Sequence, residues 1–572
     1  MGQLLTLLDR SGVPQALETL LEGRPGPAGV RPRTVLAALM LSAYYTGRAT
    51  VADAWRILHF SLRPRARTWL GIPDQAPLGA RERVAASRRL YRGLDRITTL
   101  LDPARCDRRR RLPLPDAEAL TAKWESPAGR QAAARLQQLA NQLVLAPVRI
   151  AQHRGDLRGW HGDVGVDATA IPVLANPDSD RTGLGSVEIN AGWHYSGGSD
   201  VGVFGYSAAL VIAAHRRDHR TTPKAYPQMC LGFVLDRPTV RTGQNAITAL
   251  RQLNELRLPV GICAADRAYT GQAPHNFQVP ARRLGYRLAL DYKAGERGRQ
   301  GSWDGTPLVD GSLTCPLTPT ALVEATTGAN DRAIRLRGPE LQDAIAAREP
   351  YFLKLKQGTD QRGAIRLQCP ASGPSPSVNC PRRDRLRPQV RDSLPPPAVI
   401  DLSLPRARSR HPAARPTVQL PHAEWFSPPP EDTLPRVCQS SAITVPADAN
   451  GDLHVAKYRQ DVHYLSPAWL GSYKPIRSHN EGANGRFKSS DLDIGNPKHR
   501  PAPGQVTQTL LVAVMLTIAN LTVLETWLEE RTGGFLTDAD YAAITTAELV
   551  SANNMAPTAE YPVSGRPPPA SS

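Results

Sequence analysis

Residues 164–173 have the sequence Val-Gly-Val-Asp-Ala-Thr-Ala-Ile-Pro-Val, an apolar run interrupted by one carboxylate. Short apolar runs bounded by Gly, Asp and Pro are typical of buried β-strands. A carboxylate inside such a strand is costly unless a cation or a set of hydrogen bonds compensates its charge. Asp167 is therefore a candidate for chemistry, although an aspartate in a strand is more often a structural hydrogen-bond acceptor.

Four more apolar runs follow, at residues 208–214, 231–235, 260–265 and 284–290. Between the second and third of these, residues 244–256 carry apolar side chains at helical spacing. The order predicts an α/β fold, a mixed sheet with crossover helices. Asp266 comes directly after the run that ends at residue 265. Because the first and fourth strands of this order would be central neighbours, we expect Asp167 and Asp266 on one face of the sheet.

The N-terminal part, residues 1–150, shows helical spacing without strand patterns, which predicts an all-helical domain. Residues 81–111 contain eleven Arg against four acidic residues, and they end in Arg108, Arg109, Arg110 and Arg111. Such a density suits DNA phosphates, and the alternative is a solvated helix face and loop. The 572-residue chain has a net charge of +18, which favours a nucleic-acid partner. An Arg-rich composition also follows from a GC-rich genome.

The remaining organisation is a core interrupted by an insertion. Residues 160–300 would form the first part of the core and residues 456–535 its last part. Between them, residues 301–455 predict an irregular inserted subdomain, because residues 370–435 hold 16 of the 52 prolines. Thr, Gln and Asn residues interrupt the apolar segment 501–524, so a buried helix is favoured over a membrane span. Residues 550–572 predict a disordered tail.

A third carboxylate, Glu481, lies in the segment Tyr473-Lys-Pro-Ile-Arg-Ser-His-Asn-Glu-Gly-Ala-Asn-Gly-Arg-Phe-Lys488. This segment resembles the Y-(2)-R-(3)-E-(6)-K signature of bacterial insertion-sequence transposases of the DDE type. Arg477, Glu481 and Lys488 have the signature's spacing, whereas three residues rather than two separate Tyr473 from Arg477. Residues 266–269, Asp-Arg-Ala-Tyr, and residues 165–167, Gly-Val-Asp, are similar to the family's motifs around its two aspartates.

The resemblance implies an RNase H-like catalytic core, with a subdomain inserted before the last catalytic helix. It implies that Asp167, Asp266 and Glu481 hold two Mg²⁺ or Mn²⁺ ions and that the enzyme cuts and joins double-stranded DNA at transposon ends as a homodimer. Oxygen ligands are what these hard cations prefer. Arg477 and Lys488 would offset phosphate charge, and Arg267 and Tyr269 belong to the same expected DNA-binding set.

Two alternatives to a transposase stay open. One is another RNase H-like nuclease, such as a resolvase, that lacks strand transfer. The other is an inactive or domesticated copy that binds DNA without cutting it. A nucleotide cofactor is not expected, because no Walker motif or dinucleotide-binding glycine pattern is present. The odd cysteine count and an N-terminus without a signal sequence predict a cytoplasmic, nucleoid-associated protein with no membrane partner.

The cysteines suggest a second metal. Four of the seven cysteines fall in the insertion, namely Cys315, Cys369, Cys380 and Cys438. Four thiols could bind one structural Zn²⁺ ion and order a subdomain that has little core of its own. Since no two of them are spaced as C-x2-C, four unrelated thiols are the alternative.

Overall fold

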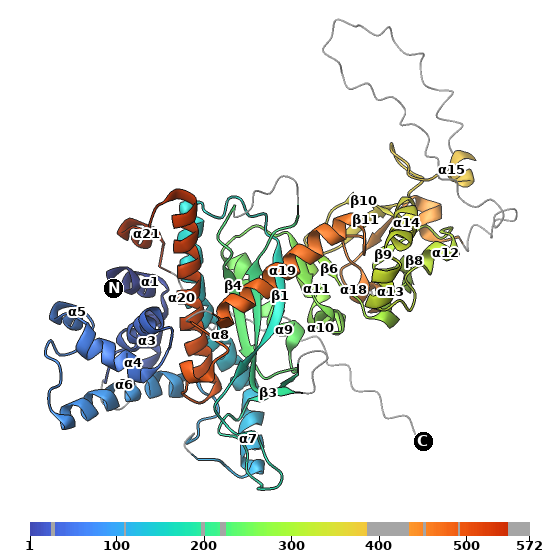
Figure 1. Cartoon of the computed structure of the whole chain (residues 1–572). Coiled ribbons are helices and arrows are strands. Elements are labelled where there is room, and N and C mark those ends of the chain that lie inside the picture. Colours follow the sequence, from blue (N-terminus) through green and yellow to red (C-terminus); the bar gives the residue numbers. More distant parts are fainter. Residues whose placement is uncertain are drawn as a thin grey trace, which may run out of the picture. The chain divides into compact units, whose positions relative to one another are not determined.

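The computed structural model describes residues 1–23, 29–107, 110–195, 201–217, 225–385, 434–449, 453–489 and 492–546. The fold is mixed α/β, as the apolar pattern predicts (Figure 1). The chain forms two compact units. The helical unit contains Met1–Arg154, Pro172–Trp193 and Ser489–Ser572, and the sheet unit contains Gly155–Ile171 and His194–Lys488. This division separates residues 489–535 from the core segment to which the sequence pattern assigned them.

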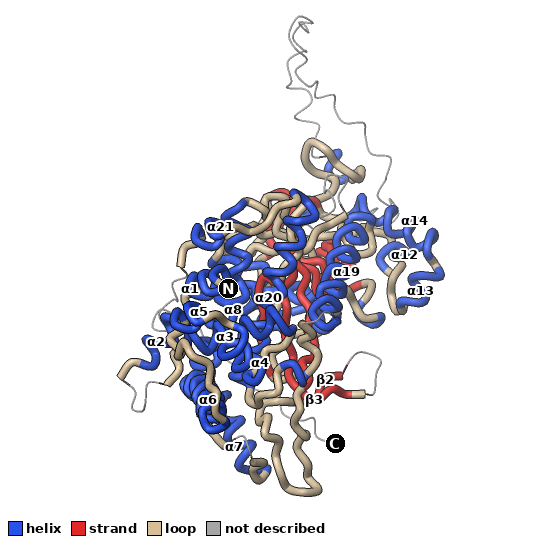
Figure 2. Tube along the Cα trace, turned by 60° about the vertical axis from the view of Figure 1, so that its left-hand side comes forward, coloured by secondary structure: helices blue, strands red, loops and turns tan. Residues whose placement is uncertain are grey.

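The described part of the helical unit is built around α20 (Gln505–Thr532), which packs on α8 (Pro127–Arg154) and α3 (Pro32–Thr46) (Figures 1 and 2). The other helices are α1 (Gly2–Arg10), α2 (Val13–Leu21), α4 (Val51–Arg56), which continues as a π-helical turn (Ile57–Ser61), α5 (Pro64–Trp69), α6 (Ala80–Leu101), α7 (Leu114–Glu125) and α21 (Asp538–Ala543). Over its first five turns α20 carries no charged residue, and most of its side chains are buried, so neighbouring helices cover nearly all of its faces.

Length and composition would let α20 cross a membrane, and no other helix in the described ranges passes that test. However, 83% of its most apolar stretch is buried inside the protein. Thr507, Gln508, Thr509, Thr517 and Asn520 are buried within it. The expectation of a buried core helix is therefore confirmed.

The long helix α6 presents arginines to solvent. Ala86, Leu90 and Leu94 are buried on one side of α6, whereas Arg88 and Arg92 are exposed on the other. Its remaining exposed arginines are Arg81, Arg83 and Arg89. The basic density noted at residues 81–111 thus includes an exposed helix face.

The main sheet has six strands in the order β2-β3-β1-β5-β6, with β4 paired to β3. The strands are β1 (Val164–Pro172), β2 (Gly192–Tyr195), β3 (Gly202–Ala213), β4 (Cys230–Asp236), β5 (Ile262–Ala265) and β6 (Arg287–Leu290). β1, β5 and β6 run parallel, and β3 and β4 run antiparallel. Helix α9 (Thr242–Glu255) crosses between β4 and β5 and packs on β3 and β4. The structure therefore has every strand that the apolar runs predicted and adds β2.

The insertion is more regular than its sequence suggests. It contains two three-stranded antiparallel sheets and several short helices. One sheet joins β7 (Arg299–Trp303), β8 (Thr306–Val309) and β9 (Ser312–Leu313), and the other joins β10 (Lys354–Gln357), β11 (Ile365–Gln368) and β12 (Ala442–Val445). The helices are α12 (Thr320–Val323), α13 (Asp331–Leu336), α14 (Gly338–Arg348), α15 (Pro381–Arg385), α17 (Arg436–Ser440) and α18 (Leu453–Tyr458). Strands of two to five residues are too short to give a readable alternation, which explains the difference.

After the insertion the chain returns to the main sheet through α19 (Pro467–Ser489). Trp469 anchors the first turn, because its Nε1 donates a hydrogen bond to the Leu290 carbonyl at 3.1 Å. Leu290 is the last residue of β6, so the start of α19 is fixed at the end of that strand. Two short helices between β5 and β6, α10 (Arg267–Thr270) and α11 (Gln278–Arg283), complete the described core.

Candidate active site

Asp167 and Asp266 occupy neighbouring positions on two adjacent parallel strands. In the pairing of β1 with β5, Val166 lies opposite Ala265, so each aspartate follows the last paired residue of its strand. Adjacent strands are about 4.8 Å apart. The two carboxylates are therefore held close together on neighbouring central strands, and the strand order predicted that β1 and β5 would be neighbours.

The helix that carries the third acidic residue approaches β1 closely. A Cβ atom built on Gly165 would lie 2.4 Å from Oδ1 of Asn480 on α19, so only glycine permits this approach. With its amide turned to satisfy both neighbours, Asn480 donates to the Gly165 carbonyl at 3.2 Å and accepts from the Val166 N–H at 3.1 Å. These contacts seat α19 directly against the strand of Asp167.

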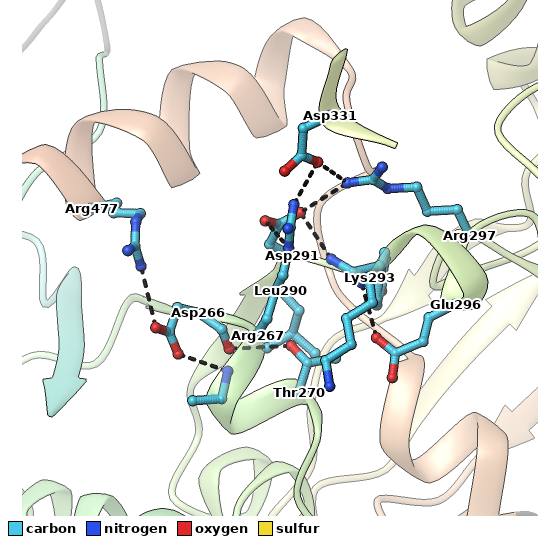
Figure 3. A network of polar contacts seen from close by, with 12 residues as sticks. Asp266, Arg267, Thr270, Leu290, Asp291, Lys293, Glu296, Arg297, Asp331 and Arg477 are labelled. Carbon is cyan, nitrogen blue, oxygen red and sulfur yellow. Dashed lines mark hydrogen bonds and ion pairs between the residues drawn. The ribbon is translucent and has the colours of Figure 1, made fainter. Parts of the chain in front are cut away.

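Arg477 of α19 connects two of the predicted carboxylates. Its Nη1 lies 3.6 Å from Oδ2 of Asp266, and its Nε lies 3.1 Å from Oε1 of Glu481 (the Asp266 pair is drawn in Figure 3). One turn further along α19, Asn484 donates to Oδ2 of Asp167 at 2.9 Å. All three predicted acidic residues are thus tied to one face of α19.

The electrostatics of Asp167 show how near the negative charges are. Its pKa is raised to about 6, first by burial and then by the charges of Asp266 and Glu481, while Arg477 and the hydrogen bond from the Ala168 N–H oppose the rise. One arginine therefore offsets the three carboxylates only in part. A site of this kind attracts additional cations.

A backbone N–H holds one carboxylate oxygen of each aspartate. Asp266 caps α10, because its Oδ1 accepts from the Ala268 N–H at 2.9 Å, and its Oδ2 faces Arg477. Oδ1 of Asp167 accepts from the Ala168 N–H at 2.9 Å. These hydrogen bonds fix the orientation of both side chains without surrounding their second oxygens.

Tyr269, from the Asp-Arg-Ala-Tyr motif, is fully buried beside the site. Burial raises its pKa, and the charges of Asp167 and Asp266 add to the rise. Its hydroxyl has no hydrogen-bond partner among the described residues. Tyr473 of α19 is also buried, and its pKa is raised by burial and by the charges of Asp291 and Asp266. Both tyrosines therefore form part of the wall behind the carboxylates.

Arg267, which follows Asp266, belongs to a network that reaches into the insertion (Figure 3). Its Nε lies 2.8 Å from Oδ2 of Asp291, just after β6, and its Nη2 lies 2.6 Å from Oδ1 of Asp331 in α13. Nη2 of the buried Arg297 lies 2.6 Å from the same oxygen of Asp331. In this arrangement Arg267 fixes the position of the insertion beside Asp266, rather than standing free to meet a phosphate.

The other predicted DNA contacts are Lys488 and the arginines at residues 108–111. Lys488 lies near the end of α19. The pKa of His194 is lowered mainly by burial and also by the nearby charge of Lys488. Arg110 is exposed. Arg111 donates to the carbonyls of residues 177, 184 and 185, which makes it a structural residue of the helical unit. Arg108 and Arg109 lie outside the described residues, as does the predicted tail at 550–572.

Four residues of the site were missed by sequence reasoning, and two of them carried a readable signal. Asn480 and Asn484 are one turn apart on the helix face that holds Arg477 and Glu481, so a polar stripe on α19 could have identified them. Asp291 and Asp331 gave no comparable signal, since each is a single acidic residue in a turn or short helix.

In the described structure, no three His, Cys, Asp or Glu side chains are arranged so that they could already hold a metal ion. At the carboxylates, Arg477 is paired with both Asp266 and Glu481. Comparisons of the chain with protein-family models, with curated proteins and with solved structures find no match.

Proposed function

We propose that this chain is a DDE-type DNA transposase, a metal-dependent polynucleotidyl transferase with an RNase H-like core. The observation that carries the proposal is the meeting of Asp167, Asp266 and Glu481 around Arg477. Asp167 lies within β1, Asp266 directly follows the adjacent parallel strand β5, and Glu481 arrives on a helix from beyond an insertion. Three carboxylates brought together from three distant segments are unusual unless something cationic is to be bound.

The sheet supports an RNase H-like core in its strand order. β1 and β5, which carry the two aspartates, are neighbours, and β6 continues the parallel part while β3 and β4 form the antiparallel part. Helix α19 then returns to β1 after the insertion, as expected for the last catalytic helix. The arrangement agrees with the motif spacing of Arg477 and Glu481.

The donor set fits Mg²⁺ or Mn²⁺. All three proposed ligands are carboxylates, the oxygen donors that hard divalent cations prefer. The raised pKa of Asp167, caused by burial and by the neighbouring Asp266 and Glu481 charges, is the physical sign that positive charge is in deficit there. The chemistry supplied at such a site, when two ions are bound, is activation of a water or 3′-hydroxyl and stabilisation of the leaving oxygen.

The chain's own residues would act around that chemistry. Asn484 holds Oδ2 of Asp167 in position by its 2.9 Å hydrogen bond. Arg477 would exchange its ion pairs with Asp266 and Glu481 for the phosphate of the substrate, because its planar guanidinium can donate to two phosphate oxygens at once. The arginine therefore neutralises the carboxylates before substrate binds and the phosphate afterwards.

Double-stranded DNA is the proposed substrate. The net charge of +18 and the exposed arginine face of α6 favour a polyanion over a neutral or acidic partner. Cleavage and joining at both ends of a mobile element would need a homodimer on DNA. A cytoplasmic, nucleoid-associated location follows from this substrate and belongs to the same proposal.

A cleavage assay tests the function. The purified full chain is incubated with a labelled DNA fragment that carries the sequences flanking its gene, with Mg²⁺, with Mn²⁺ or with EDTA. We expect metal-dependent strand cleavage that Asp167→Asn, Asp266→Asn and Glu481→Gln each reduce at least a thousand-fold. Glu529→Gln, which removes an exposed carboxylate from α20, is the matched control and should cleave normally.

The outcomes separate the alternatives. Cleavage followed by joining to a second DNA molecule supports a transposase, whereas cleavage without joining favours another RNase H-like nuclease. Binding without cleavage under any metal condition favours an inactive or domesticated copy. Equal cleavage by the wild type and all three site variants would disprove the assignment of the site.

A further inference from the structure

The four cysteines of the insertion converge on a single hydrophobic cluster. Cys315 follows β9, Cys369 follows β11, and Cys438 lies in α17, just ahead of β12. Cys380 immediately precedes α15. Cys315 and Cys369 are buried in the cluster, and Cys380 and Cys438 pack against it. Residues that are up to 123 positions apart, since 438 − 315 = 123, are thus collected in one place.

Backbone hydrogen bonds fix the segments that carry these cysteines. The Cys369 N–H donates to the Ser441 carbonyl at 2.8 Å, which continues the pairing of β11 with β12. The Cys315 N–H donates to the Tyr351 carbonyl at 2.8 Å. Nη2 of Arg383, in α15 beside Cys380, donates to the Cys438 carbonyl at 3.0 Å. The convergence therefore rests on hydrogen bonds to main-chain carbonyls, not on the thiols alone.

The thiols are near enough to influence one another's ionisation. Burial raises the pKa of Cys315, and charge on Cys369, Cys438 or Cys380 would raise it further. Burial and charges on Cys369 and Cys380 raise the pKa of Cys438 to about 11. All four are free thiols, so no disulfide explains why they are together. Four protonated thiols in one cluster make few hydrogen bonds, since S–H is a weak donor.

Cations surround the cluster. The charges of Arg383 and Arg382 lower the pKa of Cys438, against the larger effect of burial. Lys354, at the start of β10, lies near Cys369. Burial lowers the pKa of Lys354, and negative charge on Cys369 opposes that effect. A Zn²⁺ ion bound by four thiolates carries a net charge of −2, and these three side chains would balance it. An ordinary apolar core gains nothing from such neighbours.

We propose that Cys315, Cys369, Cys380 and Cys438 together bind one structural Zn²⁺ ion in the insertion. Four sulfur donors in a tetrahedron are the usual environment of structural zinc, and coordination removes the thiol protons. The thiols are not yet at ligand positions in the described structure, where no three such side chains are arranged to hold a metal. Each cysteine has three staggered side-chain positions, and binding would turn the four sulfurs toward the ion.

The physical reason for such an ion is the small core of this subdomain. Its strands have two to five residues, and single sheets of this size bury little apolar surface. Cys380 and Cys438 also bracket the proline-rich stretch in the sequence, so one ion would join the two ends of that segment. Zinc would thereby fix the insertion, including Asp331 and its contact with Arg267.

Metal analysis of the full chain tests the proposal. Protein produced with added zinc and purified without chelators should contain one zinc per chain by elemental analysis. Its zinc X-ray absorption spectrum should show four sulfur neighbours at about 2.3 Å. Cys369→Ala and Cys438→Ala should each lose at least nine-tenths of the zinc. Cys263→Ala, at a fully buried cysteine of β5 outside the insertion, is the control and should retain it.

Stability provides the second measurement. A strong zinc chelator should lower the melting temperature of the wild type and of Cys263→Ala, and it should leave Cys369→Ala unchanged. Should Cys369→Ala fail to fold, the half-buried Cys380→Ser and the wild-type absorption spectrum still decide the question. The proposal would be overturned if the wild type contained no zinc, or if Cys380→Ser and Cys438→Ala retained it. A zinc spectrum with oxygen rather than sulfur neighbours would also overturn it. Because the proposed catalytic ligands are oxygens, loss of cleavage and loss of the zinc–sulfur signal are independent results.

Discussion

Replacement of Asp167 by Asn should stabilise the metal-free protein while it abolishes cleavage. Burial and the charges of Asp266 and Glu481 raise the Asp167 pKa from 3.8 to about 6. At 1.36 kcal/mol per pKa unit, ionising this side chain in the folded protein costs at most about 3 kcal/mol. Asparagine removes that cost, but it has only one side-chain oxygen and cannot accept the hydrogen bonds from both Asn484 and Ala168. The lost hydrogen bond lowers the stability by about 1 kcal/mol. A net gain of about 1–2 kcal/mol follows.

The sign of the pH dependence is specific. The folded protein holds the Asp167 proton up to about pH 6, whereas the unfolded chain releases it near pH 4. The gain from Asp167→Asn should therefore be small at about pH 4, grow as pH rises and be complete above about pH 6. Melting temperatures measured in EDTA across this range test the prediction. Added Mg²⁺ should stabilise the wild type and leave the variant unchanged.

A neighbouring aspartate provides the control. Asp163 lies just before β1, but it accepts from the Ile262 N–H at 2.8 Å and pairs with Arg216 at 2.9 Å. Asp163→Asn should therefore destabilise the protein at neutral pH. The reasoning about the site is refuted if Asp167→Asn also destabilises, or if its effect is the same at about pH 4 and at about pH 8.

Three further predictions concern the helix seat, the insertion network and DNA contact. Gly165→Ala should cost about 1–3 kcal/mol and reduce cleavage at least ten-fold, because its Cβ would clash with α19. Gly482→Ala is the control, because a Cβ atom added at Gly482 would meet no atom within 4 Å, and this variant should keep activity and gain up to about 1 kcal/mol of folding stability. Equal behaviour of the two variants in unfolding and cleavage assays would contradict the close approach of α19 to Gly165. Asp331, whose pKa is lowered to about 2 chiefly by its hydrogen bond with Arg267, is half exposed, so Asp331→Asn should cost only about 0.5 kcal/mol. That loss should disappear as pH falls from about 4 to about 2, and a pH-independent difference in melting temperature would refute it. Arg88→Gln combined with Arg92→Gln on α6 should reduce the slope of log affinity against log salt by about 1.8, and an unchanged slope would remove α6 from the DNA contact.

The strands of the main sheet were predictable because each is a buried apolar run with clear boundaries. Their order then made β1 and β5 neighbours, so the pairing of Asp167 with Asp266 followed from the sequence as well. The insertion was not predictable in the same way. Its strands are short and its contacts, such as Gln368 opposite Ala442, join residues far apart in the chain.

The assignment of α20 shows another limit of local pattern. Its apolar character correctly indicated a buried helix, but not which neighbours would bury it. The sequence order placed it with the core, whereas it packs on α8 and α3 in the helical unit. A helix that is apolar on all sides can be buried by any complementary surface, so the partner is decided by packing.

For the site itself, the sequence alone determined which carboxylates follow strands and which side chains share a face of α19. Helical geometry puts Arg477 and Glu481 one turn apart, and their 3.1 Å ion pair follows directly from that spacing. Only the tertiary structure decided that this face meets β1, through Asn480 and the missing side chain of Gly165. The periodicity of a helix is a local property, whereas the approach of α19 to β1 depends on packing between segments that no local pattern relates.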